Sequence, residues 1–190
     1  MESRFGAIEG VIRTFVGYAG GRMASPTYAD LGDHTETVQI DFDPRRTSYA
    51  ALLAVFWNSH HPESHGWSRQ YLNAVFYHDE RQRQAAMASK AEVQRRLGRA
   101  VGSEILPVRF FTPAEDYHQK YILKRQTDLA REMSLIYPRH SDFVRSTAVT
   151  RLNGYVGGYG SPAQLAREID SLGLSADGRR ILLEKVQHAS

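Results

Sequence analysis

Two short apolar stretches lie near the start of the chain, and in the second of them apolar and polar positions alternate. Residues 11–16 are mainly apolar, and residues 37–42 place Val38, Ile40 and Phe42 on one side of an extended segment. A period of two is typical of a strand with one buried face. The two strands are joined by residues 17–36, a glycine-rich stretch. Loops of this length inside a compact domain are usually functional, so this crossing is the first place to look for a site.

Beyond residue 42, helical and strand patterns take turns. Helices are expected where apolar residues recur every three or four positions, often behind a residue that can cap the helix. The predicted helices are 2–7, 48–59, 79–98, 113–131, 162–171 and 176–187, and the predicted strands are 11–16, 37–42, 72–77 and 104–110. Short strands among longer helices favour the α+β class, here a two-layer sandwich with a mixed, mainly antiparallel sheet.

The pattern changes after Tyr137-Pro138. Residues 153–160 hold four glycines, which is too many for the inside of a helix or strand. We therefore expect a main domain over residues 1–137. Residues 138–190 are expected to form a glycine-rich segment and helices that pack on that domain.

Composition limits the possible classes of protein. A chain of 190 residues with 42% hydrophobic residues can build one domain with a real core. It contains no apolar run long enough for a membrane span and no signal-peptide pattern, so a cytoplasmic protein without a membrane partner is expected. The printed sequence has no cysteine, which excludes disulfides, thiolate metal sites and a cysteine nucleophile within it. The net charge of +3 is mostly scattered arginine, as on a solvated surface.

Two residues of the glycine-rich crossing carry groups that could take part in a reaction. Tyr28 offers a hydroxyl on a rigid ring, and Glu36 stands at the mouth of the strand with the apolar face. A carboxyl held against such a face should have a raised pKa and could act as a general acid. The alternative is a surface carboxylate at a strand end and a tyrosine that fills a turn. Spacing alone favours this alternative.

A second polar loop, residues 60–71, adds aromatic residues and histidines. If the two loops meet over the sheet, Tyr28, Trp67 and Tyr71 would wall a small pocket around Glu36. Metal binding by the loop histidines is disfavoured, because neighbouring histidines rarely bind one ion together and no clear carboxylate complement is present. Solvated histidines are expected instead; these are His60, His61 and His65.

The basic helix face formed by Arg95, Arg96 and Arg99 has no interleaved aromatic residues. Nucleic-acid binding is therefore not expected. The glycines near residue 154 match neither a phosphate loop nor a dinucleotide fingerprint, because the strand-turn-helix context and the lysine are missing.

Several segments, in unbroken order from Met1 to about Tyr121, resemble the A-type peptide methionine sulfoxide reductases. This ordered set is far more specific than any single motif. The segments are Met1-Glu2-Ser3-Arg4-Phe5-Gly6-Ala7-Ile8-Glu9-Gly10-Val11, Val16-Gly17-Tyr18-Ala19-Gly20-Gly21, Pro26-Thr27-Tyr28, His34-Thr35-Glu36, Phe56-Trp57, Arg69-Gln70-Tyr71 and Ala114-Glu115-Asp116-Tyr117-His118-Gln119.

The resemblance implies an α/β roll and reduction of the S epimer of methionine sulfoxide, free or in proteins. By this resemblance Glu36 gives a proton to the sulfoxide oxygen, and Tyr28 and Tyr71 hydrogen-bond it. No bound cofactor or metal is implied. The implied partners are oxidised methionine and an external thiol reductant such as thioredoxin, and the expected state is a monomer.

The chain departs from the family pattern at the nucleophile. The family's Gly-Cys-Phe-Trp motif would lie just before Met1, the resolving cysteines are absent, and His65-Gly66-Trp67 replaces an acidic residue. Three explanations are open: a gene product that starts earlier, a selenocysteine whose codon is mistaken for a stop, or loss of catalysis. We expect the printed chain to be inactive alone. The alternative function is a catalytically silent protein that binds methionine sulfoxide.

Overall fold

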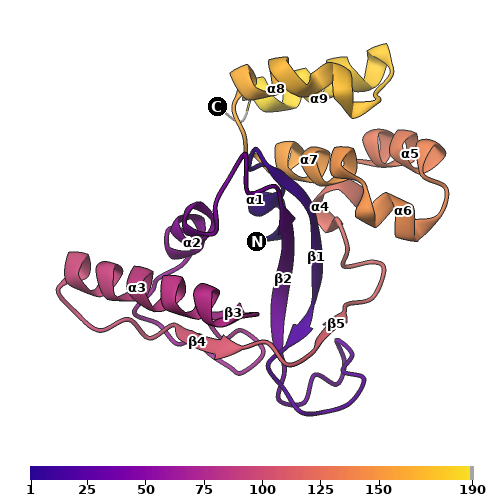
Figure 1. The fold of residues 1–190 in the computed structure, drawn as a ribbon. Helices are drawn as coiled ribbons and strands as arrows, with labels where there is room; N and C mark the ends of the chain where they lie inside the picture. Colours follow the sequence, from indigo (N-terminus) through magenta and orange to yellow (C-terminus); the bar gives the residue numbers. More distant parts are fainter. Residues whose placement is uncertain (189–190) are drawn as a thin grey trace. The chain divides into compact units, whose positions relative to one another are not determined.

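The protein has α+β architecture in a computed structural model that describes residues 1–188 (Figure 1). This confirms the fold class predicted from the sequence pattern. The strands are β1 (Val11–Ala19), β2 (Thr35–Phe42), β3 (Ala74–Tyr77), β4 (Glu104–Pro107) and β5 (Phe111–Pro113). The helices are α1 (Glu2–Gly6), α2 (Tyr49–Trp57), α3 (Glu80–Leu97), α4 (Tyr121–Lys124), α5 (Thr127–Ile136), α6 (His140–Arg145), α7 (Thr147–Val156), α8 (Pro162–Glu168), the 3₁₀ helix η1 (Ile169–Leu172) and α9 (Ala176–His188).

The chain folds into two compact units. The first contains residues 1–15, 38–46 and everything from Asp116 onward, and the second contains residues 16–37 and 47–115. The sheet order is β2-β1-β5, with β5 antiparallel to the end of β1, and β3 pairs with β4 in parallel. The division predicted near residue 137 stays a prediction. No helix within residues 1–188 is both long and apolar enough to cross a bilayer.

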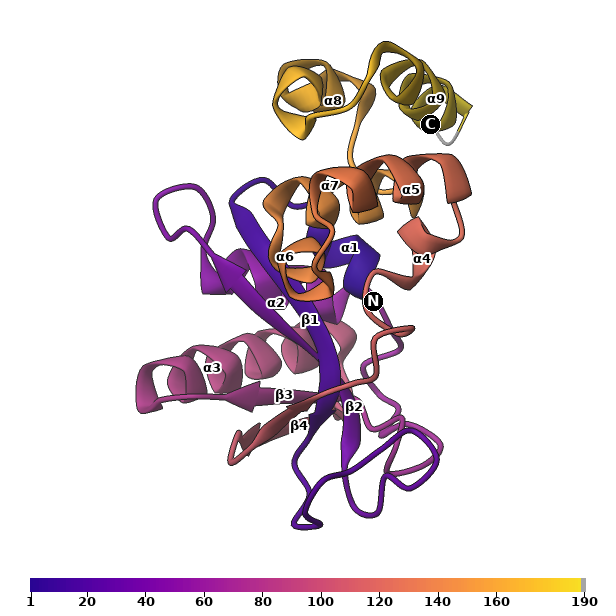
Figure 2. The same cartoon turned by 90° about the vertical axis from the view of Figure 1, so that its right-hand side faces the viewer.

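The second unit carries both of the loops that the sequence pattern singled out. Its helix α3 lies alongside β3 and β4 (Figures 1 and 2). The caps of this helix are those predicted: the Asp79 side chain accepts the Gln82 N–H at 2.7 Å, and Gly98 ends the helix in the left-handed conformation. The buried residues of the core between the helices are Leu53, Trp57, Ala86, Val93 and Val101. This packing provides a rigid support for the loops.

The first unit is mainly helical and is built around α7. Its apolar core includes Leu123, Leu129, Met133, Leu152 and Leu165, all fully buried. Helices α6 and α7 were not predicted. The prediction that residues 153–160 lie outside regular structure is wrong for residues 153–156, which form the last turn of α7.

Close packing against α1 explains a glycine inside α7. A β-carbon on Gly154 would lie 2.4 Å from the Ala7 nitrogen, and one on Gly6 would lie 2.5 Å from the Thr150 carbonyl oxygen. Two helices that cross at glycines can bring their backbones together, and this tertiary contact outweighs the low helix propensity of glycine.

We expect Gly154→Ala to lower the free energy of unfolding by about 1–3 kcal/mol, because the added methyl group meets backbone that cannot move aside. Exposed helical Gly→Ala changes have the opposite sign. Gly178→Ala in α9 is the comparison variant, since its methyl would meet a side-chain carboxylate, that of Glu132, instead of backbone. Urea denaturation of the three proteins measures the effect. A Gly154→Ala midpoint at or above that of the parent would contradict the packing argument.

The prediction of a helix over residues 113–131 is wrong in its first half. Residues 111–113 form β5, with Tyr18 opposite Thr112 and Gly17 opposite Pro113. The Ala114 N–H then donates to the Val16 carbonyl at 3.0 Å. Pairing with β1 overrides the local helix signal of the proline and the acidic residues that follow it. The helical part begins only at Tyr121.

Candidate active site

The two long loops of the second unit meet through hydrogen bonds that backbone carbonyls accept. The Thr35 hydroxyl donates to the Arg69 carbonyl at 2.9 Å, and the Glu36 N–H donates to the Gln70 carbonyl at 3.0 Å. In the opposite direction, from the second loop to the first, the Arg69 guanidinium donates to the Asp33 carbonyl at 3.0 Å. The start of β2 is therefore fastened to the segment that carries Tyr71.

The glycine-rich loop is ordered by its own polar side chains. The Asp33 carboxylate accepts the backbone N–H groups of Arg22 and Met23 at 2.8 and 3.2 Å, and these bonds lower the pKa of Asp33. His34 is buried, with one ring nitrogen 2.9 Å from the Met23 carbonyl and the other 3.3 Å from the Gly21 nitrogen. These contacts fix the backbone on both sides of the turn that holds Tyr28.

One amide joins two of the predicted site residues. The Gln70 side-chain nitrogen donates to the Glu36 carboxylate at 2.7 Å and to the Tyr71 hydroxyl at 3.2 Å. Partial burial, the nearby charge of Glu36 and a hydrogen bond with Tyr28 raise the pKa of Tyr71. A raised pKa keeps the Tyr71 phenol neutral and able to donate its proton in a hydrogen bond. The structure thus gathers Glu36, Tyr28 and Tyr71 in one cluster.

Tyr28 occupies the tip of a small turn. The backbone of Thr27 and Asp30 closes the turn by two hydrogen bonds of 3.0 and 3.2 Å. The Tyr28 side chain is 45% exposed. Trp67 stacks on Tyr71 with ring centroids 4.6 Å apart, and it is 82% exposed. The aromatic residues therefore form an open surface cluster rather than an enclosed pocket.

The predicted burial of Glu36 against the apolar face of its strand is wrong, because the residue is exposed. Its face-mates Val38 and Ile40 are half-buried further along β2. Glu36 is only the second residue of the strand, and its side chain meets the polar amide of Gln70 instead of apolar groups.

The arrangement can supply protons and neutral hydrogen-bond donors to one small polar group. A carboxyl group can act as a general acid, and two phenols can orient an oxygen atom that accepts hydrogen bonds. A sulfur nucleophile is not part of it, since the printed sequence has no cysteine.

Sequence reasoning did not assign a role to Gln70 or Arg69, although their segment was among those that carry the family resemblance. Both act through contacts more than 30 residues away, with Glu36, Asp33 and Gly20. The only sequence signal for them was their position directly before Tyr71.

His60, in the second loop, has a structural role as a half-buried, hydrogen-bonded side chain. His60, expected to be solvated, is half-buried, and its ring contacts the Phe56 carbonyl at 2.8 Å and the Ser103 hydroxyl at 2.9 Å. Burial lowers its pKa, so the neutral ring is favoured. Within residues 1–188 no three or more histidine, aspartate or glutamate side chains gather as a metal site.

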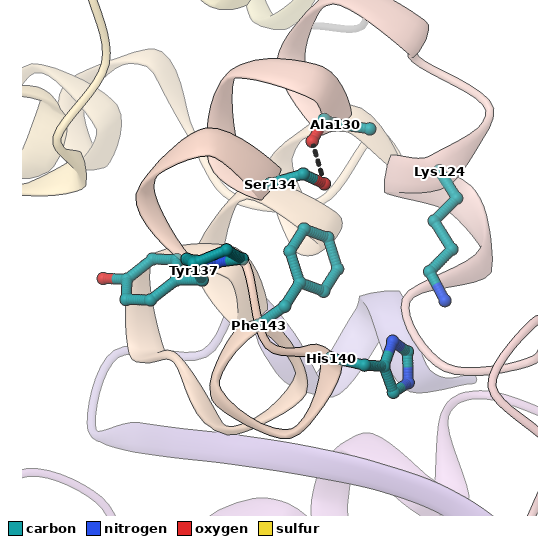
Figure 3. Close-up of a pocket in the computed structure, with 7 residues that line it drawn as sticks. Lys124, Ala130, Ser134, Tyr137, His140 and Phe143 are labelled. Carbon is teal, nitrogen blue, oxygen red and sulfur yellow. Dashed lines mark hydrogen bonds between the residues drawn. The ribbon is translucent and has the colours of Figure 1, made fainter.

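A cavity of about 160 Å³ lies among the helices of the first unit (Figure 3). The Ser134 hydroxyl on its wall is already used by the Ala130 carbonyl at 2.8 Å. His140 lies 3.0 Å from the Asp116 carboxylate, and burial and the neighbouring Lys124 lower its pKa. The lining residues are Lys124, Ala130, Ser134, Tyr137, Pro138, His140 and Phe143, none of them a predicted site residue.

Comparison with known proteins identifies the family. The family model described as peptide methionine sulfoxide reductase matches residues 1–151. A second model, described as the helical domain of selenoprotein methionine sulfoxide reductase A, matches residues 141–185.

Individual relatives agree with these matches. A peptide methionine sulfoxide reductase of Drosophila melanogaster is 44% identical over 184 residues, which cover 94% of this chain and 72% of the relative. The enzyme named MsrA from Methanococcoides burtonii is 42% identical over 139 residues, or 66% of this chain and 90% of the relative.

Among solved structures, methionine sulfoxide reductase A of Corynebacterium diphtheriae is similar, with a TM-score of 0.58 and 26% identity. The match covers 66% of this chain and 69% of the other. With family models along most of its length and relatives above 40% identity, the chain belongs to the peptide methionine sulfoxide reductases of the A type.

Proposed function

We propose that the protein reduces the S epimer of methionine sulfoxide, free or in proteins, as a repair reaction. The observation that carries this proposal is the Gln70 amide, which holds the Glu36 carboxylate and the Tyr71 hydroxyl together, with Tyr28 hydrogen-bonded to Tyr71. An acid beside two phenols matches the needs of a sulfoxide oxygen, which accepts hydrogen bonds first and then a proton.

In the proposed reaction a nucleophile attacks the sulfoxide sulfur, while Glu36 protonates the oxygen and the hydroxyls of Tyr28 and Tyr71 orient it. The bond formed between the nucleophile and the substrate sulfur then breaks together with the sulfur–oxygen bond. The oxygen passes to the nucleophile, which becomes a sulfenic or selenenic acid, and methionine leaves. A thioredoxin-like dithiol then reduces this acid, becoming a disulfide as water is released. The reaction requires no bound cofactor.

We further propose that the nucleophile is a cysteine or selenocysteine outside residues 1–190. The match of residues 141–185 to a helical domain described for a selenoprotein reductase supports the selenocysteine. Translating the DNA upstream of the codon for Met1 tests the proposal directly. A UGA codon or a cysteine codon within a Gly-x-Phe-Trp sequence is expected.

The activity test compares residues 1–190 with a chain extended through that codon. The extended protein should reduce methionine S-sulfoxide with a dithiol and leave the R epimer unreacted, while residues 1–190 should not turn over. Turnover by the cysteine-free chain would overturn the assignment of the nucleophile. Equal rates on both epimers would overturn the proposed substrate.

The second candidate function is recognition of oxidised methionine without reduction. The cluster of Glu36, Tyr28 and Tyr71 supports it over other non-catalytic roles, because a carboxyl group and two phenols can hydrogen-bond a sulfoxide oxygen without a nucleophile beside them. Binding of the S-sulfoxide by an extended chain that shows no turnover would select this candidate.

A further inference from the structure

The segment Ala114–Gln119 belongs to the family resemblance but has no part in the reaction proposed above. Its carboxylate at Glu115 makes two hydrogen bonds within the second unit. One oxygen accepts the Tyr18 hydroxyl at 2.6 Å, and the other accepts the Tyr28 backbone N–H at 2.9 Å. Glu115 therefore connects Tyr18, which is buried in β1, with the loop tip that carries Tyr28.

The Tyr18 end of this connection lies in a well-packed part of the second unit. Tyr18 is 1% exposed and lies in β1 opposite Thr112 of β5. It packs with Leu31 and Ala114 in a small buried cluster. The Ala114 N–H is itself bonded to the Val16 carbonyl, so Glu115 follows directly on a fixed backbone.

On the loop side, the bond from the Tyr28 N–H to Glu115 lies at the tip of the turn, between the flanks that Asp33 and His34 hold. Residues 27–30 are all exposed, and an exposed loop tip is where backbone order is usually lowest. A hydroxyl that must meet a substrate oxygen needs a fixed backbone beneath it. One Glu115 oxygen is enough to accept the hydrogen bond of the buried Tyr18 hydroxyl. The other oxygen is bonded to the Tyr28 N–H, so Glu115 has a second role beyond satisfying Tyr18.

We propose that Glu115 is a positioning residue, which anchors the Tyr28 backbone to the buried Tyr18 so that the Tyr28 hydroxyl meets that of Tyr71. The catalytic meaning of this role rests on the proposed function, but the anchoring itself is a property of residues 1–190. Glutamine can preserve it, because its carbonyl can accept the Tyr28 N–H while its amide donates to the Tyr18 oxygen. Alanine removes both contacts.

The test follows the titration of the Tyr71 phenol in residues 1–190, by NMR of tyrosine labelled at the ring carbon that bears the hydroxyl. Because the hydrogen bond with Tyr28 raises the pKa of Tyr71, Tyr28→Phe should lower it. Glu115→Ala should lower it in the same direction, and Glu115→Gln should keep it near that of the parent. Glu63→Gln, which removes a carboxylate paired with Arg99 in the same unit, is the control and should have no effect.

The decisive comparison is the double variant. If Glu115 acts through Tyr28, Glu115→Ala should cause no further shift in a Tyr28→Phe protein. If Glu115→Ala instead acts through its lost charge, or through a general loosening of the loop, it should still shift the Tyr71 pKa in the Tyr28→Phe protein, and that result would contradict the inference. An unchanged Tyr71 titration in Glu115→Ala, when Tyr28→Phe does shift it, would overturn the inference and leave the proposed function intact.

In the extended protein with its nucleophile, Glu115→Ala should lower kcat/KM for methionine S-sulfoxide by up to about tenfold, the value of one hydrogen bond. Glu115→Gln should restore most of this loss. Failure of the extended protein to reduce the sulfoxide would remove the proposed function, whereas the titration would still report whether Glu115 anchors Tyr28.

Discussion

Replacing Glu36 by glutamine should lower the rate of sulfoxide reduction by about 10²–10⁴-fold in a protein that carries the nucleophile. Glutamine has nearly the same size, and its side chain can keep a hydrogen bond with Gln70, so the fold should be retained. An amide cannot supply the proton that allows oxygen to leave sulfur. Single-turnover reduction of an N-acetylmethionine sulfoxide ester by the extended chain, measured across pH, gives the size of the loss.

The pH dependence separates a general acid from a structural carboxylate. Without Glu36 the remaining route takes its proton from solvent, so the rate of the Glu36→Gln variant should fall as pH rises. Glu63→Gln is the matched control, since it removes a carboxylate of the same unit that pairs with Arg99. An unchanged rate for Glu36→Gln at neutral pH would make Glu36 a strand-end carboxylate without a part in the chemistry.

The two phenols should share their role. Tyr28→Phe and Tyr71→Phe are each expected to cost less than Glu36→Gln, because one hydrogen bond to the oxygen survives in each. The double variant should cost more than either single variant, since no phenol then remains to donate a hydrogen bond to the oxygen.

Local signals in the sequence predicted those parts of the fold that local energies decide. Ser48 and Asp79 cap their helices as expected, with side chains that accept the backbone N–H three residues later. Gly98 ends α3 because glycine adopts the left-handed conformation at little cost. The alternation in residues 37–42 marks β2 correctly, although the strand begins two residues earlier.

Long-range contacts decided the parts that were missed. Residues 111–113 become a strand because β1 offers them a partner about 95 residues away in sequence, a distance that follows from the register. Gly154 lies inside a helix because α1 approaches its backbone. Neither partner could be inferred from the composition of the segment itself.

The candidate site shows the same division. The sequence placed Tyr28, Glu36 and Tyr71 in two loops and at the mouth of a strand, and the structure brings these loops together. The exposure of Glu36 and the bridging role of Gln70 depend on the geometry where the loops meet, which no periodicity encodes. The resemblance to a known family assigned roles to these three residues, whereas the hydrophobic pattern and spacing alone did not distinguish a chemical role from a structural one.

The first unit contains a buried ion pair that sequence reasoning did not detect. Lys120 is fully buried, and its ammonium lies 2.6 Å from the Glu2 carboxylate, which is 8% exposed. The second Glu2 oxygen accepts the Lys120 backbone N–H at 2.9 Å, and the Thr14 hydroxyl donates to the first at 3.0 Å. Burial lowers the pKa of Lys120, while the charge of Glu2 opposes this shift.

Removing one partner should therefore be costly. We expect Lys120→Met to lower the free energy of unfolding by about 3–5 kcal/mol, because Glu2 would remain charged and buried without a counterion. Lys120 also has a positive φ of 54°, which methionine would keep, so the backbone strain stays the same in the comparison.

The double variant Glu2→Gln with Lys120→Met identifies the cause of this loss. It removes both charges, so most of the stability lost in Lys120→Met should return, as replacement of buried pairs by neutral groups is often nearly neutral. Urea denaturation of the parent, the two single variants and the double variant measures the coupling between the two residues. If the double variant is as unstable as the sum of the single variants, the pair acts through packing volume and not through charge, and the electrostatic explanation fails.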